Sequence, residues 1–119
     1  MAKILFVEDN ESIQKTLGMC LSDICKHYVV PAFDGQEGLK ILSEIKDVQI
    51  IISDYNMIPM DGFRFTEQIR TNPEYKHYSN IPIIGLGDFP KDRREHLTEF
   101  RTKPATYLEL NELIKKHCI

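Results

Sequence analysis

The 119-residue sequence contains no tryptophan, only three cysteines and no long uncharged apolar stretch. A membrane-spanning helix needs about 18 consecutive apolar residues, so the sequence predicts no membrane partner. Cys20, Cys25 and Cys118 are odd in number and lack Cys-x-x-Cys spacing, which predicts reduced thiols and a cytoplasmic location. No sign of charge dominates either. Fifteen basic and 18 acidic residues give a net charge of −3, which argues against direct binding of nucleic acid through bulk charge.

What is present is the composition of one globular domain. Hydrophobic residues make up 42% of the chain and charged residues 28%, both ordinary values for a folded protein. The length also matches one domain rather than two. We therefore expect residues 1–119 to form a single domain that folds without disulfides or a structural metal.

Short apolar runs alternate with helical periodicity along the chain. The apolar runs predict strands at 3–7, 28–33, 48–52, 81–86 and 99–102. The periodic segments predict helices at 12–24, 36–46, 62–70, 90–98 and 106–117, and residues 71–80 are expected to be polar and irregular. The buried face of the first helix is expected to carry Ile13, Leu17, Cys20, Leu21 and Ile24. This alternation predicts an α/β fold with a parallel sheet covered on both faces, and Pro31 predicts that the second strand lies at a sheet edge.

Charged side chains follow three of the predicted strands. Glu8 and Asp9 end the first strand, Asp54 follows the third, and Lys103 follows the fifth. Because the carboxyl ends of parallel strands share one edge of the sheet, these four side chains are expected to converge there. Three close carboxylates repel one another unless a cation such as Mg²⁺ lies among them, and lysine is suited to phosphate. The pattern predicts a phosphoryl-transfer site with an aspartate nucleophile.

Two simpler interpretations of the same residues stay open. An acidic or amide side chain directly after a strand is often only the N-terminal cap of the next helix, a role that Asp9 or Asn10 could take. Asp54 and Lys103 could form a purely structural ion pair. The coincidence of charged groups at the ends of three different apolar strands favours a functional site.

Motifs along the whole chain resemble the receiver domain of two-component response regulators. They are Val7-Glu8-Asp9-Asn10, Asp34-Gly35, Ser53-Asp54-Tyr55-Asn56-Met57, Pro59-Met60-Asp61-Gly62, Ile81-Pro82-Ile83-Ile84 and Lys103-Pro104, in the order of that family. The resemblance implies a flavodoxin-like (βα)5 three-layer sandwich whose five-stranded parallel sheet has the order 2-1-3-4-5.

The resemblance also implies roles for individual residues. Asp54 would accept a phosphoryl group from a histidine kinase or a phosphotransfer protein. Asp9, Asp54 and the backbone carbonyl of Asn56 would hold Mg²⁺ with help from Glu8, while Lys103 would pair with the phosphoryl oxygens. Phe100 falls at the position of the family's switch aromatic. With no output domain in the sequence, the chain would act by binding a downstream protein partner rather than as a turnover enzyme.

Four features depart from the family pattern. Gly87 replaces the Ser or Thr expected at the end of the fourth strand, where the hydroxyl binds the phosphoryl group. Asp88 adds a fourth carboxylate, which either opposes an incoming anion or caps the following helix. The segment from Gly87 to Lys103 is short, so the helix within it must be truncated or displaced. Pro59 also comes one residue late, which constrains Ile58.

These departures keep other functions open. Gly87 and Asp88 favour a degenerate receiver that binds proteins regardless of phosphorylation, whereas the intact Glu8, Asp9, Asp54 and Lys103 favour a phosphoacceptor. A Mg²⁺-dependent phosphatase would need a second aspartate at the position of Asn56. A flavodoxin-like electron carrier would need a phosphate-binding loop after the first strand, where this chain is acidic.

Overall fold

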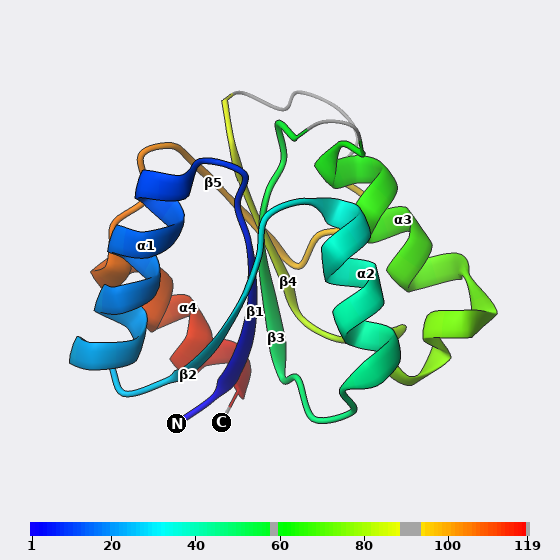
Figure 1. Cartoon of the computed structure of the whole chain (residues 1–119), viewed down its shortest axis with the longest axis horizontal. Helices are drawn as coiled ribbons and strands as arrows, with labels where there is room; N and C mark the ends of the chain where they lie inside the picture. Colours follow the sequence, from blue (N-terminus) through cyan, green and yellow to red (C-terminus); the bar gives the residue numbers. More distant parts are fainter. Residues whose placement is uncertain (58–59, 89–93, 119) are drawn as a thin grey trace.

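Five parallel strands form one sheet in the order β2-β1-β3-β4-β5, as predicted (Figure 1). The structure is a computed structural model that describes residues 1–57, 60–88 and 94–118. The strands are β1 (Lys3–Val7), β2 (Tyr28–Ala32), β3 (Ile50–Asp54), β4 (Ile83–Gly87) and β5 (Glu99–Thr102). β2 lies at the edge of the sheet and pairs with β1 alone, so the prediction from Pro31 is confirmed.

Helices cover both faces of the sheet and complete a three-layer sandwich. They are α1 (Glu11–Met19), α2 (Gly35–Glu44), α3 (Gly62–Thr71) and α4 (Tyr107–Cys118), with a π-helical turn η1 (Cys20–Ile24) and a 3-10 helix η2 (Pro73–Tyr78). α1 and α4 pack on one face, and α2 and α3 on the other (Figure 1). Within the described ranges, no helix is long and apolar enough to span a membrane.

The central strands are apolar on both sides because a helical layer covers each face. Every residue of β3 and β4 is buried. Successive side chains of β3 alternate between the layers: Ile51 belongs to the core under α2 and α3, and Ile50 and Ile52 to the core under α1 and α4. β3 begins two residues later than predicted, since Val48 donates its N–H to the Tyr78 hydroxyl, and it ends at Asp54.

The buried face of the first helix differs from the prediction. Ile13 is 38% exposed and Ile24 is 57% exposed, whereas Gln14 and Leu21 are buried. The cause of the error at Ile24 is η1, in which the Cys25 N–H bonds the Cys20 carbonyl five residues back. A π turn holds more residues than an α turn and therefore rotates the following side chains away from the α-helical periodicity.

Residues 71–80 were wrongly expected to be irregular. They contain η2, whose Tyr75 and Tyr78 are buried in the core under α2 and α3. The Tyr78 hydroxyl donates to the Ile45 carbonyl at 2.5 Å and so satisfies its polar group inside the core. Because the residues around the two tyrosines are polar, the sequence pattern did not predict η2 as a packed element.

The helix predicted over 90–98 is not formed in its described part. Residues 90–93 lie outside the described residues, and 94–98 form turns that lead into β5. Arg70 of α3 fixes this segment by donating to the carbonyls of His96 and Ser79 at 3.0 and 3.1 Å. Leu97 packs over Gly85, where an added Cβ would lie 2.7 Å from the leucine Cδ1. A side chain from a turn, and not from a helix, therefore covers this part of β4.

Candidate functional site

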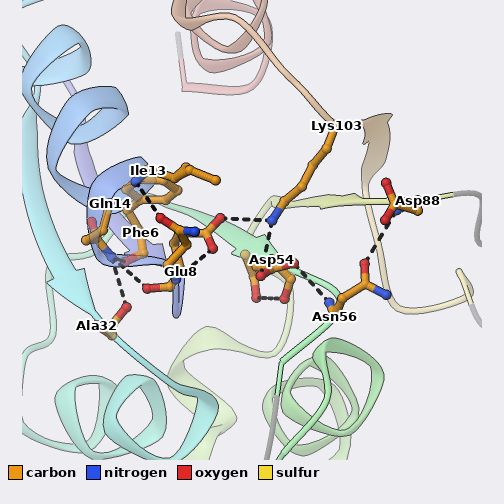
Figure 2. Close-up of polar contacts among 11 residues, drawn as sticks. Phe6, Glu8, Ile13, Gln14, Ala32, Asp54, Asn56, Asp88 and Lys103 are labelled. Atoms are coloured by element: carbon orange, nitrogen blue, oxygen red, sulfur yellow. Dashed lines mark hydrogen bonds and ion pairs between the residues drawn. The ribbon is translucent and has the colours of Figure 1, made fainter.

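The carboxyl ends of β1 and β3 bring three carboxylates together. Glu8 and Asp9 directly follow β1, and Asp54 is the last residue of β3. One oxygen from each lies within 4.8 Å of the other two. Glu8 and Asp54 are buried, with 0% and 2% of their surface exposed, and Asp9 is exposed. The convergence expected from parallel strands is present in the structure, and Figure 2 shows Glu8 and Asp54 within it.

Lys103 reaches this cluster from the residue after β5. Its Nζ lies 3.1 Å from Glu8 Oε1 and 3.2 Å from Asp54 Oδ2 (Figure 2). Burial alone would lower the pKa of the Lys103 ammonium, but the charges and hydrogen-bonding oxygens of Asp54 and Glu8 outweigh it and raise this pKa. The lysine therefore stays cationic and bridges two acidic groups.

The Glu8 carboxylate is buried, and its surroundings raise its pKa above the ordinary value. Burial raises its pKa to about 7 and the nearby Asp54 charge adds to the rise, while the Asn10 N–H and Lys103 act in the opposite direction. Its Oε2 accepts the Asn10 N–H at 3.1 Å. Its Oε1 is buried and has the Lys103 ammonium nearby, yet it accepts no well-oriented hydrogen bond from the described residues. An under-coordinated carboxylate oxygen in an acidic cluster fits a hard divalent cation such as Mg²⁺.

Both oxygens of Asp54 have positively polarised neighbours. Oδ1 accepts the Asn56 backbone N–H at 2.9 Å, and Oδ2 faces Lys103. The loop that starts at Tyr55 is tied to the sheet, because the Tyr55 N–H donates to the Leu86 carbonyl at 2.7 Å. These contacts fix the Asp54 carboxylate at the carboxyl end of β3.

The N-terminal cap of α1 is Asn10, whose Oδ1 accepts the Ile13 N–H at 3.0 Å. Of the two residues considered for this cap, Asn10 therefore takes it, and Asp9 keeps its carboxylate beside Glu8 and Asp54. The simplest structural explanation for Asp9 does not apply.

Gly87 ends β4 beside this site, and its missing side chain leaves room for Asn56. An added Cβ at Gly87 would lie 2.7 Å from Asn56 Oδ1 and 3.6 Å from Phe100 Cζ. Asn56 Oδ1 also accepts the Asp88 N–H in a long bond of 3.4 Å (Figure 2). The Asn56 carboxamide thus lies at the end of β4, where a larger residue would place its own side chain.

Phe100 is half-buried and has aromatic and cationic neighbours. Its ring meets that of Tyr55 edge-to-face at 6.2 Å between centroids, and the Arg94 guanidinium lies 4.7 Å from its centroid. The Asp88 side chain is exposed. The first turn of the helix that Asp88 was expected either to cap or to leave uncapped, residues 90–93, lies outside the described ranges, as does the Ile58–Pro59 departure. The roles of Gly87, Asp88 and Phe100 stay predictions.

Two features near the cluster were not found from the sequence. A groove of about 600 Å³ lies between α1 and the start of α4. Its lining includes Glu8 and Lys103, and its walls are mostly apolar, with Ile13, Leu17 and Leu108 among them. The buried Gln14 lies under Glu8. Its only sequence signal was a polar residue between the apolar Ile13 and Leu17.

Comparison with known proteins identifies a family. The sequence model of the response regulator receiver domain matches residues 4–113. A protein of Rhizobium etli described as "probable chemotaxis protein CheY" is 35% identical over 86 residues, which are 72% of this chain and 66% of that protein. The chain thus spans slightly less than two thirds of this relative.

Solved structures agree in fold. The chemotaxis protein CheY4 of Vibrio cholerae superposes with a TM-score of 0.84 at 31% identity, over 98% of each chain. The receiver domain of a sensor histidine kinase from Pseudomonas aeruginosa, which holds a magnesium ion in its active site cleft, has a TM-score of 0.82. It is 23% identical over 98% of this chain and 96% of its own, so it supports the fold alone.

Proposed function

Because the chain belongs to the response regulator receiver domain family, we propose that it is a phosphoacceptor of a two-component phosphorelay, with Asp54 as the acceptor. The observation that carries this proposal is the position of the Asp54 carboxylate, buried at the sheet edge between the Lys103 ammonium and the carboxylates of Glu8 and Asp9. The donor would be a histidine kinase or a phosphotransfer protein. The product would signal by binding a downstream protein, without catalytic turnover.

The chemistry follows from the groups at this edge. One Asp54 oxygen attacks the phosphorus of a phosphohistidine, the nitrogen–phosphorus bond breaks, and its electron pair stays on the donor imidazole. Lys103 would pair with the transferred phosphoryl oxygens, a role that its distance of 3.2 Å from Asp54 Oδ2 supports. The Asn56 N–H orients the other carboxylate oxygen.

Glu8, Asp9, Asp54 and the Asn56 carbonyl would hold Mg²⁺. The bound ion would supply positive charge that offsets the repulsion between the carboxylates and the incoming phosphoryl group. The buried Glu8 Oε1 without a well-oriented hydrogen bond is the structural feature that supports this ligand set. Removing the charge of Asp9, as in Asp9→Asn, should remove most of the affinity.

The degenerate receiver is the second candidate function. The observation that favours it is Gly87, which leaves the end of β4 without a hydroxyl for the phosphoryl group. In that case the domain would bind its partner equally well with or without phosphate. The retained acidic cluster and Lys103 favour the phosphoacceptor.

Beryllofluoride, a stable mimic of an aspartyl phosphate, distinguishes the two. In Mg²⁺, the phosphoacceptor should show saturable shifts of the amide resonances near Asp9, Asp54 and Gly87, and Asp54→Ala should show none. A domain that binds Mg²⁺ but shows no beryllofluoride-dependent shift would be the degenerate form.

A further inference from the structure

Gln14 is a buried polar side chain of α1 that the proposed chemistry does not use. It is 5% exposed and points from the helix toward the ends of β1 and β2 (Figure 2). Its Nε2 lies 3.0 Å from the Ala32 carbonyl, 3.1 Å from the Phe6 carbonyl and 3.5 Å from the Glu8 carbonyl. All three partners are acceptors, so the atom among them must be the NH₂ group of the carboxamide and not its oxygen.

These contacts hold the backbone from which Glu8 and Asp9 project. The Ala32 carbonyl accepts both the Gln14 amide and the Glu8 N–H, the latter at 3.0 Å. The Glu8 carbonyl is the most distant of the three acceptors around the Gln14 amide. One side chain therefore joins α1, the end of β1 and the edge strand β2 at the first residue of the acidic cluster.

We propose that Gln14 is a positioning residue that sets the affinity of the Glu8, Asp9 and Asp54 cluster for a divalent cation. The inference rests on the proposed function, because it needs the cluster to bind Mg²⁺. Glu8 and Asp9 are consecutive, and their carboxylates reach Asp54 only if the chain leaves β1 in one direction. Without the Gln14 amide, the end of β1 is held at this point by fewer hydrogen bonds, and the carboxylates sample positions that do not share a cation.

The test is a Mg²⁺ titration of the metal-free protein, monitored by its amide chemical shifts. It compares wild type with three variants. Gln14→Met keeps the length of the side chain but cannot donate, and we expect its Mg²⁺ affinity to fall about tenfold, the lower end of the effect of losing an outer contact to a metal ligand. In Gln14→His, the neutral imidazole retains one N–H donor. The Mg²⁺ affinity of this variant should therefore lie between that of Gln14→Met and that of wild type. It also provides the comparison with wild type if Gln14→Met does not fold.

Tyr78→Phe is the matched control. It also removes a buried polar group that bonds backbone, but at the other end of the sheet, where the Tyr78 hydroxyl contacts Ile45 and Val48. This variant should lose stability and keep the wild-type Mg²⁺ affinity, which separates positioning from general destabilisation.

Equal Mg²⁺ affinity in wild type, Gln14→His and any folded Gln14→Met would overturn the role of Gln14 while leaving the proposed function intact. Equal loss in Tyr78→Phe and Gln14→Met would also overturn it, since stability alone would then explain the effect. A wild-type protein that shows no Mg²⁺ response would overturn the ligand set of the proposed function, and the role of Gln14 with it.

Discussion

A hydroxyl added at residue 87 should strengthen the response of this domain to phosphorylation. Gly87 has no positive φ, so its backbone accepts other residues without strain. In Gly87→Ser, the new Cβ would lie 2.7 Å from Asn56 Oδ1 and 3.3 Å from Tyr55 Cβ. The first contact is with the end of a flexible, exposed side chain, so Asn56 can swing away. Its bond to the Asp88 N–H, already 3.4 Å long, is then lost.

The two effects differ in size. Losing the long Asn56–Asp88 bond costs on the order of 0.5–1 kcal/mol, and this cost falls on the free and the phosphorylated states alike. A serine hydroxyl that donates to the charged phosphoryl group contributes about 1.5–3 kcal/mol to the phosphorylated state alone. Only a difference between states shifts an equilibrium, so the added bias is roughly tenfold to a hundredfold.

Gly87→Ala is the control, because it adds the same Cβ and displaces Asn56 equally but has no hydroxyl. We expect Gly87→Ser to bind beryllofluoride in Mg²⁺ at least about tenfold more tightly than Gly87→Ala. In wild type, amide shifts should stay near Asp9, Asp54 and Gly87, and in Gly87→Ser they should extend through Phe100 into α4. Equal affinities of the two variants, or wild-type shifts that already run through Phe100, would refute this reasoning.

Three further predictions concern stability and pH. Because burial raises the pKa of Glu8 to about 7, protons compete with the cation, so Mg²⁺ affinity measured by titration should rise between pH 6 and 8 and level off above it. A pH-independent affinity below 7 would contradict the Mg²⁺ role of Glu8. Hydrogen bonds from Lys116 and His117 lower the pKa of Glu99 to about 2, below its ordinary 4.5. Its stabilising contribution, on the order of 1 kcal/mol after solvent screening, should therefore be present above pH 4.5 and be lost as the pH falls toward 2. Urea unfolding of wild type and Glu99→Gln should converge at low pH, and a constant gap between them would count against this ion pair. Gly85→Ala should lower the free energy of unfolding by about 1–3 kcal/mol, since its Cβ would meet Leu97 Cδ1 at 2.7 Å, and an unchanged urea midpoint would show that Leu97 is free to move.

The sequence predicted those parts of the molecule that depend on local pattern. Runs such as those of β3 and β4 are apolar because both faces are buried, so the strands and their parallel arrangement followed from the pattern. The order of the strands in the sheet came from the resemblance to the receiver family. The meeting of Glu8, Asp54 and Lys103 also followed, because parallel strands end at one edge. These inferences need periodicity and topology but no side-chain geometry.

Most of the remaining features depend on contacts between distant residues. The periodicity of the sequence does not predict the π turn that exposes Ile24. It also does not predict the packing that buries Tyr75. The contact of Asn56 with the end of β4 needs the relative position of two loops. In the sequence, Gln14 is only a polar residue between the apolar Ile13 and Leu17, and its three carbonyl partners come together only in the fold. Apart from the π turn, which is local, each miss is a long-range interaction that local pattern does not encode.

The central claim is that Asp54 is the phosphoacceptor of this domain. The most direct measurement is the intact mass of the protein after incubation with acetyl phosphate and Mg²⁺. The account predicts one acid-labile phosphoryl group on wild type, none without Mg²⁺, and none on Asp54→Ala. A phosphoryl group that persists in Asp54→Ala, or a wild-type protein that binds Mg²⁺ and never gains one, would contradict it.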